Sequence, residues 1–280
     1  MKDLIKNKRF DEERALYNLT DARVFECTFA GPADGESVLK EARQIEVDSC
    51  SFSLRYPLWH VRTFYLSGSK MDELTRAPIW YAEDGVIDSC ELFGTKAVRE
   101  CRNISVKNSK IKSAEFGWKC DRIELLSSEI ESEYLFLDSK HVRLDGVRMK
   151  GKYSFQYVED LVIENSILDT KDAFWHAKNV TVKNSTVKGE YLAWFSEGLT
   201  MINCKIIGTQ PLCYCKDLTL IDCEMIDTDL SFEYSEVNAT VRGTIVSVKN
   251  PKSGSITADG VGELIYGDAV TECEGKVYIR

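Results

Sequence analysis

The feature that most constrains the fold is a short pattern that returns at a fixed interval along the chain. Residues 178–187 read KNVTVKNSTV, and related stretches stand 19 residues before and 19 residues after, EDLVIENSIL and EGLTMINCKI. From Gly85 to Val237 the first position of each copy follows the previous one by 19 residues. A constant period of this length is typical of a solenoid, in which each coil stacks on the one before it.

Each copy of the pattern predicts two short strands joined by a bend. Apolar residues stand at the first, third and eighth positions, as Ile104, Val106 and Ile111 do in one copy. The spacing of two is the period of a β-strand. The fifth position carries residues that tolerate a left-handed backbone, such as Asn108 and Asn165. The remaining residues, for example 191–196, predict a third strand that completes the coil.

Three strands per coil predict an all-β, single-stranded right-handed parallel β-helix of about twelve coils of 19 residues. We interpret residues 1–280 as one domain, with an N-terminal cap and partial coil over 1–21, regular coils over 22–249 and a C-terminal cap over 250–280. Within the caps we expect a helix over 1–13 and short strands after 262. Insertions at 31–37 and 71–77 interrupt the first coils. Hexapeptide, leucine-rich and calcium-binding nonapeptide repeats do not fit, because their signatures are absent.

Charge and hydropathy exclude several classes of partner. The net charge is −9 and no run of Lys or Arg occurs, which argues against nucleic acid and against anionic membranes as partners. No stretch approaches the ~18 apolar residues of a membrane helix. The first residues, MKDLIKNKRFDEERALYNL, are charged throughout and do not resemble a secretory signal. We therefore expect a cytoplasmic protein.

The ten cysteines predict core packing and not disulfides or metal binding. No CxxC motif occurs and the chain has only three histidines, so we expect no metal and no cofactor. Eight cysteines fall at two repeat positions that otherwise hold Ser, Ala or Val, as expected for small buried residues. These eight are Cys27, Cys50, Cys90, Cys204 and Cys223 at one position and Cys101, Cys120 and Cys215 at the other.

Four segments carry a resemblance to a known family: ALYNLTDARVFECTFAGPADGESVLKE (15–41), SFSLRYPLWH (51–60), APIWYAEDG (77–85) and DAFWHAKNVTVKNS (172–185). The chain resembles the right-handed β-helix proteins of the pectin-lyase-like superfamily, and more closely a bacterial family of uncharacterised single β-helix proteins. The resemblance covers nearly the whole chain and implies the fold. It implies no reaction and assigns no catalytic residue.

The third strand of each coil holds the candidate functional residues. If its side chains alternate strictly, the five tryptophans Trp59, Trp80, Trp118, Trp175 and Trp194 point inward as an internal stack. The intervening positions then point outward and form an aromatic face dotted with His and Asp, which favours a partner that covers it. We take ten of its residues as candidate ligand-binding residues: Tyr134, Asp138, Tyr153, Tyr157, Asp172, Phe174, His176, Tyr191, Phe195 and Tyr214.

Three functions are compatible with this face. We favour non-covalent binding of a carbohydrate or cell-wall precursor, with an oligosaccharide as the partner. The first alternative is a polysaccharide lyase or glycoside hydrolase, although the adjacent Asp pair and G-H-G string of galacturonase-type hydrolases are absent. The second alternative is a structural protein that forms a homodimer through the face.

Overall fold

The computed structural model describes residues 2–31 and 35–280. Most of the insertion expected at 31–37 falls on residues outside these ranges or at their edge. The chain divides into two compact units, Met1–Arg143 (unit 1) and Leu144–Arg280 (unit 2), and each is described by itself. The assignment of the whole chain to one domain stays a prediction.

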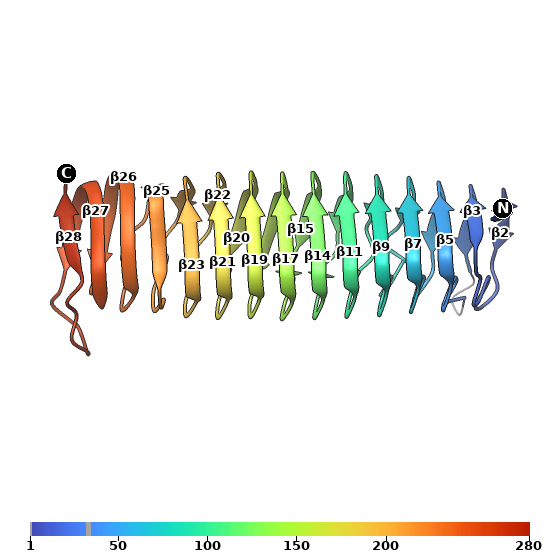
Figure 1. The fold of residues 1–280 in the computed structure, drawn as a ribbon, viewed down its shortest axis with the longest axis horizontal. Helices are drawn as coiled ribbons and strands as arrows, with labels where there is room; N and C mark the ends of the chain where they lie inside the picture. Colours follow the sequence, from blue (N-terminus) through green and yellow to red (C-terminus); the bar gives the residue numbers. More distant parts are fainter. Residues whose placement is uncertain (1, 32–34) are drawn as a thin grey trace. The chain divides into compact units, whose positions relative to one another are not determined.

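Unit 1 is a stack of coils in which strands of the same kind pair in parallel, each with the strand one coil away (Figure 1). The first strands of its coils are β1 (Asp3–Lys6), β3 (Ala22–Phe25), β5 (Arg43–Asp48), β7 (Arg62–Ser67), β9 (Glu83–Asp88), β11 (Arg102–Lys107) and β14 (Asp121–Leu126). The second strands are β2 (Arg9–Phe10), β4 (Thr28–Ala30), β6 (Ser51–Ser53), β8 (Lys70–Met71), β10 (Glu91–Leu92), β12 (Lys110–Lys112) and β15 (Glu129–Ser132). Two short third strands are β13 (Glu115–Phe116) and β16 (Tyr134–Leu135).

Unit 2 repeats the same architecture with longer strands near its C-terminal end. Strand β17 (Lys140–Asp145) contains the boundary between the two units in the sequence. The first strands of unit 2 are β19 (Glu159–Glu164), β21 (Lys178–Lys183), β23 (Glu197–Ile202), β25 (Leu218–Ile226), β26 (Glu236–Lys249), β27 (Ser253–Ile265) and β28 (Lys276–Ile279). The second strands are β18 (Arg148–Tyr153), β20 (Ile167–Lys171), β22 (Thr186–Lys188) and β24 (Lys205–Ile207).

The core of each unit lies inside its coils and is built from columns of like residues. In unit 1, Ile104 pairs with Ile123 in the neighbouring coil, and Ile111 is likewise buried. In unit 2, Val180 pairs with Leu199 in the same way. Each coil buries its apolar face only against its neighbours, which is why the sequence pattern must repeat. The predicted all-β parallel β-helix is confirmed.

The ends of the chain differ from the expectation. The helix expected over 1–13 is wrong, because β1 and β2 form a further coil that pairs with β3 and β4. Phe10 stacks on Phe29 with ring centroids 5.1 Å apart, which explains why this segment continues the core. At the other end β27 and β28 also continue the coils, so the turns number about fourteen instead of twelve. The described residues contain no helix.

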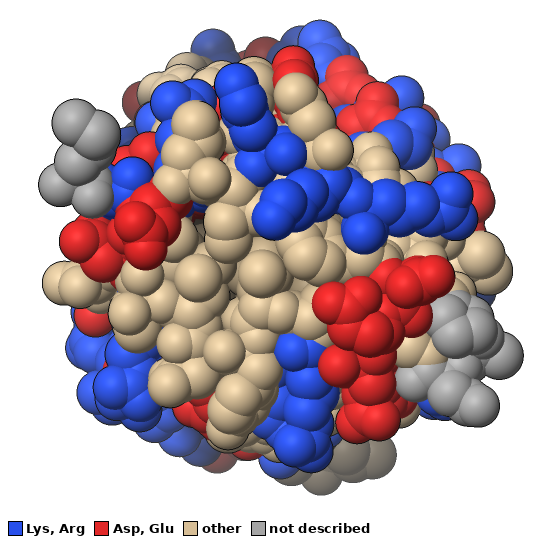
Figure 2. Space-filling model, turned by 90° about the vertical axis from the view of Figure 1, so that its right-hand side faces the viewer, with Lys and Arg blue, Asp and Glu red and all other residues tan. Residues whose placement is uncertain are grey.

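The N-terminal end of unit 1 presents an uncharged centre with Lys, Arg, Asp and Glu side chains around it (Figure 2). Its edge strand β1 carries the exposed Leu4 between charged neighbours. Charged side chains at a free strand edge oppose pairing with another sheet. In the described part of this segment, charge therefore takes the role that a helical cap was expected to have.

Candidate functional site

The third segment of each coil is not a regular strand, because left-handed residues alternate along it. In one coil of unit 2, Asp172, Phe174 and His176 have φ values of 49°, 63° and 56°. Ala173, Phe174 and Ala177 are buried in this coil. Two neighbouring residues thus point into the core, which a strictly alternating strand does not allow. The residues on either side of this buried pair decide what the outer surface offers.

The outward placement of one column of candidate residues is therefore wrong. Phe174 is only 2% exposed, and inside the core its ring stacks on Phe155 with centroids 5.1 Å apart. Asp172 is buried as well, and this burial raises the pKa of its carboxyl group. The reason for the error is the left-handed alternation, which turns the Phe174 position inward. Neither side chain is available to a ligand in this conformation.

The inward placement of the tryptophans is also wrong, although they do stack. Trp175 and Trp194 are half-buried, with ring centroids 5.5 Å apart and planes within 3° of parallel. Each indole N–H donates to a backbone carbonyl of the next coil, Trp175 to Tyr191 O at 2.7 Å and Trp194 to Gln210 O at 2.8 Å. In unit 1 the stacked pair Trp59 and Trp80 repeats the arrangement. The tryptophans therefore tie coil to coil from the outer side.

A second aromatic column runs beside the tryptophans in unit 2 and is the surface that the sequence analysis sought. The unit 2 ladder consists of Tyr157, His176, Phe195 and Tyr214, which stack with centroids 5.0, 5.1 and 4.8 Å apart. Tyr157 is 55% exposed and Phe195 is 44% exposed. The ring planes lie within 15° of one another, so the rings cover each other's faces. What the ladder presents to solvent is therefore a row of ring edges.

The other candidate residues surround this ladder or lie elsewhere. Tyr191 contacts Trp194 edge to face at 5.4 Å, and the Lys171 ammonium lies 5.5 Å from its ring centroid. Tyr153 is half-buried in unit 2. The half-buried Tyr134 and the exposed Asp138 belong to unit 1. The structure thus brings together Tyr157, His176, Phe195 and Tyr214, with Tyr191 beside them.

The described residues offer little acid–base chemistry at this ladder. No hydrogen bond joins His176 to Asp172 or to any other carboxyl group among the described residues, because the imidazole is held between Tyr157 and Phe195. No group of three or more His, Cys, Asp or Glu side chains in the described ranges is arranged to hold a metal ion. The arrangement can therefore bind a ligand, and its geometry shows no catalytic pair in the part of the chain described.

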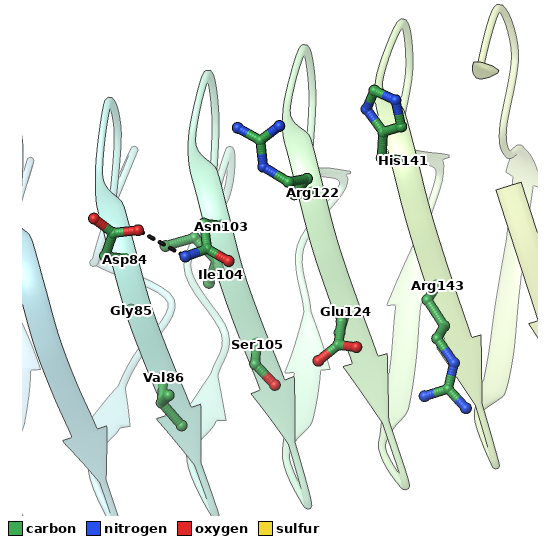
Figure 3. Close-up of a pocket in the computed structure, with 10 residues that line it drawn as sticks. All are labelled: Asp84, Gly85, Val86, Asn103, Ile104, Ser105, Arg122, Glu124, His141 and Arg143. Carbon is green, nitrogen blue, oxygen red and sulfur yellow. Dashed lines mark hydrogen bonds between the residues drawn. The ribbon is translucent and has the colours of Figure 1, made fainter. Parts of the chain in front are cut away.

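A polar depression on unit 1 was missed by sequence reasoning. One hollow of about 540 Å³ lies on the outer face of β9, β11, β14 and β17, with side chains from Asp84 to Arg143 around it (Figure 3). A second hollow of about 640 Å³ lies toward β5 and β7 and shares Asp84 and Val86 with the first. Polar side chains on a solvent-facing strand look ordinary in a sequence, so the pattern carried no signal for a groove.

The fold and these surfaces define a parallel β-helix protein with a stacked aromatic ladder in unit 2 and a polar depression in unit 1. The chain belongs to the family described as protein of unknown function (DUF3737), whose model matches residues 3–279. No curated protein sequence matches it. No helix of the described residues is long and apolar enough to cross a membrane.

Three solved structures are similar in fold. PfbA, a surface adhesin of Streptococcus pneumoniae, is 10% identical, with 86% of this chain and 82% of that chain covered and a TM-score of 0.45. The A-module of the mannuronan C-5 epimerase AlgE4 of Azotobacter vinelandii is 10% identical, with 100% and 89% covered and a TM-score of 0.33. The catalytic domain of a GH87 α-1,3-glucanase is 7% identical, with 99% and 64% covered and a TM-score of 0.39. At these values the likenesses carry no argument about function.

Proposed function

We propose that this chain binds carbohydrate without transforming it, and that an oligosaccharide lies along the unit 2 ladder. The observation that carries the proposal is the ladder itself, in which aromatic rings of successive coils stack at about 5 Å and keep exposed edges. An exposed aromatic surface of this kind is unusual for a protein without a partner, because burying it would be favourable.

The stacked geometry determines how a sugar would be held. Pyranose rings usually pack on aromatic faces, but the faces inside the ladder are already covered by neighbouring rings. The exposed edges carry the hydroxyl groups of Tyr157 and Tyr214 and the ring nitrogens of His176. Among the described residues neither hydroxyl has a hydrogen-bond partner. These groups donate and accept hydrogen bonds, as sugar hydroxyls do.

The spacing of the ladder supports a repeating ligand. Coils follow one another at ~4.8 Å, which is comparable to the length of one sugar residue in an extended glycan. Each further sugar residue would therefore meet a further coil. Weak contacts that repeat in register add up along such a ligand, as in other multivalent interactions.

A glycan array tests the proposal, followed by titration calorimetry with the glycan that binds. We expect Tyr157→Phe, which removes only the hydroxyl group, to weaken binding by about 1 kcal/mol or roughly fivefold. His176→Ala should also weaken it. Tyr81→Phe is the matched control, because Tyr81 stacks on His60 in unit 1 as Tyr157 stacks on His176 in unit 2.

Other outcomes would favour the alternatives. A wild-type protein that binds no glycan, or a Tyr157→Phe variant that binds as tightly as wild type, would contradict the proposal. Cleaved or unsaturated products from a bound glycan would support an enzyme. A stable homodimer that Phe195→Lys separates would support the structural alternative, since such interfaces bury on the order of 1,600 Å².

A further inference from the structure

We propose that the polar depression of unit 1 is a second binding site, which takes an extended, neutral oligosaccharide. Its two hollows share Asp84 and Val86 and therefore form one continuous depression, called here the unit 1 trough. It follows the outer face of the first strands from β5 to β17. The proposal rests on this surface alone and does not depend on the unit 2 ladder.

The trough follows from a backbone kink that repeats in each coil. Thr63, Asp84 and Asn103 have φ values of 53°, 55° and 55°, in the left-handed region. The parallel register passes over them, pairing Arg62 with Glu83 and then Phe64 with Gly85. A left-handed residue inside a strand bends it locally, as in a β-bulge. Because every coil kinks at the same position, the bends line up along the outer face of unit 1.

Tyr65 gives the trough an aromatic surface that the unit 2 ladder lacks. Its ring is 38% exposed, and its column neighbours are Glu46 in one coil and Val86 in the other. No aromatic ring stacks on Tyr65 among the described residues, so its faces are not taken by other rings. The hydroxyl donates to Asp88 Oδ2 at 3.1 Å, which fixes the orientation of the ring. A fixed aromatic ring beside polar groups is a typical element of a sugar site.

The polar side chains of the trough favour a neutral ligand rich in hydroxyl groups. Asn103 Nδ2 donates to Asp84 Oδ1 at 2.7 Å, and both side chains keep further hydrogen-bonding capacity (Figure 3). Ser105 lies next to Glu124 in the adjoining strand and adds a hydroxyl group. Charges of both signs line the floor, so a polyanion or a polycation would meet repulsive groups along its length. A hydroxyl-rich neutral chain donates to the carboxylates and accepts from the cations.

The length of the trough indicates an extended ligand. Its lining residues come from the coils of β5, β7, β9, β11, β14 and β17. Five coil steps at ~4.8 Å span roughly 24 Å. A monosaccharide would contact only one or two coils. We therefore expect affinity to rise with the length of the oligosaccharide until the trough is filled.

Titration calorimetry of the full chain with neutral, linear gluco-oligosaccharides of increasing length tests this inference. We expect Tyr65→Ala to weaken binding roughly tenfold, which corresponds to about 1.4 kcal/mol. Ser105→Tyr should abolish it by filling the trough. Ser51→Tyr on the exposed face of β6 is the matched control and should bind like wild type.

The results separate this site from the ladder. Tyr157→Ala should leave binding of these oligosaccharides unchanged if they occupy the trough. Absence of binding, affinity independent of length, or wild-type affinity in both Tyr65→Ala and Ser105→Tyr would overturn the inference. Preference for a polyanion such as dextran sulfate would also overturn it, because the ligand would then not be neutral. The ladder proposal is decided independently by Tyr157→Phe with the glycan that binds on the array.

Discussion

At the scale of single residues, left-handed backbone at positions without glycine decides which side chains reach solvent. Phe174 and His176 both have positive φ, and one lies in the core while the other lies in the ladder. Such conformations cost roughly 1–2 kcal/mol per residue. They persist because each coil is held by its neighbours through pairing and core burial.

Truncation of two phenylalanines in unit 2 tests this assignment of inside and outside. Phe174→Ala removes a buried ring and should lower the free energy of unfolding by about 3–5 kcal/mol. Phe195→Ala removes a ring that is 44% exposed and should cost clearly less. Urea unfolding of both variants measures the difference. Equal losses would mean that the two positions are not buried as the structure has them.

Asp88 makes a pH-dependent contribution to stability. Hydrogen bonds, first of all from Asn108 Nδ2 at 3.0 Å, hold the pKa of Asp88 down to about 2. Because the folded-state pKa is depressed, the stabilisation is fully present above the unfolded pKa of about 3.9 and is lost as the pH falls toward about 2. Asp88→Asn should therefore be less stable than wild type near neutral pH.

Unfolding of both proteins over a range of pH checks this prediction. The difference in unfolding free energy between wild type and Asp88→Asn should shrink as the pH is lowered to about 2. A difference that stays constant across this range would show that the carboxylate charge is not what stabilises the turn.

At the scale of elements, the first two strands and their bend could be predicted from the sequence, and the third segment could not. The bend residues Asn108 and Asn165 are left-handed, both with φ of 51°, as their residue type indicated. Ile104 and Val106 are buried, as the period of two required. Strict alternation failed in the third segment because aromatic residues such as Phe174 adopt left-handed conformations that their residue type does not favour.

The cysteine columns are the clearest case in which small size and periodicity predicted burial. All eight cysteines of the two columns are buried, and no disulfide links any cysteine among the described residues. Burial raises the pKa of Cys50 to about 12 and that of Cys90 to about 11. A hydrogen bond from Cys223 lowers the pKa of Cys204 to about 7, but Cys204 is only 1% exposed.

Thiol labelling of the native protein therefore has a definite expected result. Cys273 is the most exposed cysteine of the described chain and should react first with a thiol reagent such as DTNB. The other nine should react only as the protein unfolds, since access requires opening of the coils. Rapid reaction of Cys204 in the folded state would show that its lowered pKa outweighs its burial. Cys273→Ser is the control that removes the fast phase.

At the scale of the whole molecule, the fold was predictable because one 19-residue period runs through most of the chain. The ends were not, because β1, β27 and β28 continue the coils with residues outside the strict register. The candidate site was predictable as a set of aromatic residues on the third segment. Its geometry was not, because the sequence does not reveal that Tyr157, His176, Phe195 and Tyr214 cover each other's ring faces.

Hydrogen–deuterium exchange of the full chain, with and without the glycan that binds on the array, tests the central claim most directly. The account predicts slower exchange on ligand addition in residues 172–176, 191–195 and 210–214, which hold the ladder and its flanking segments. The same experiment on Tyr157→Phe should show weaker protection at equal ligand concentration. Protection confined to other coils, with these three segments unchanged, would contradict the claim that unit 2 binds carbohydrate along its aromatic ladder.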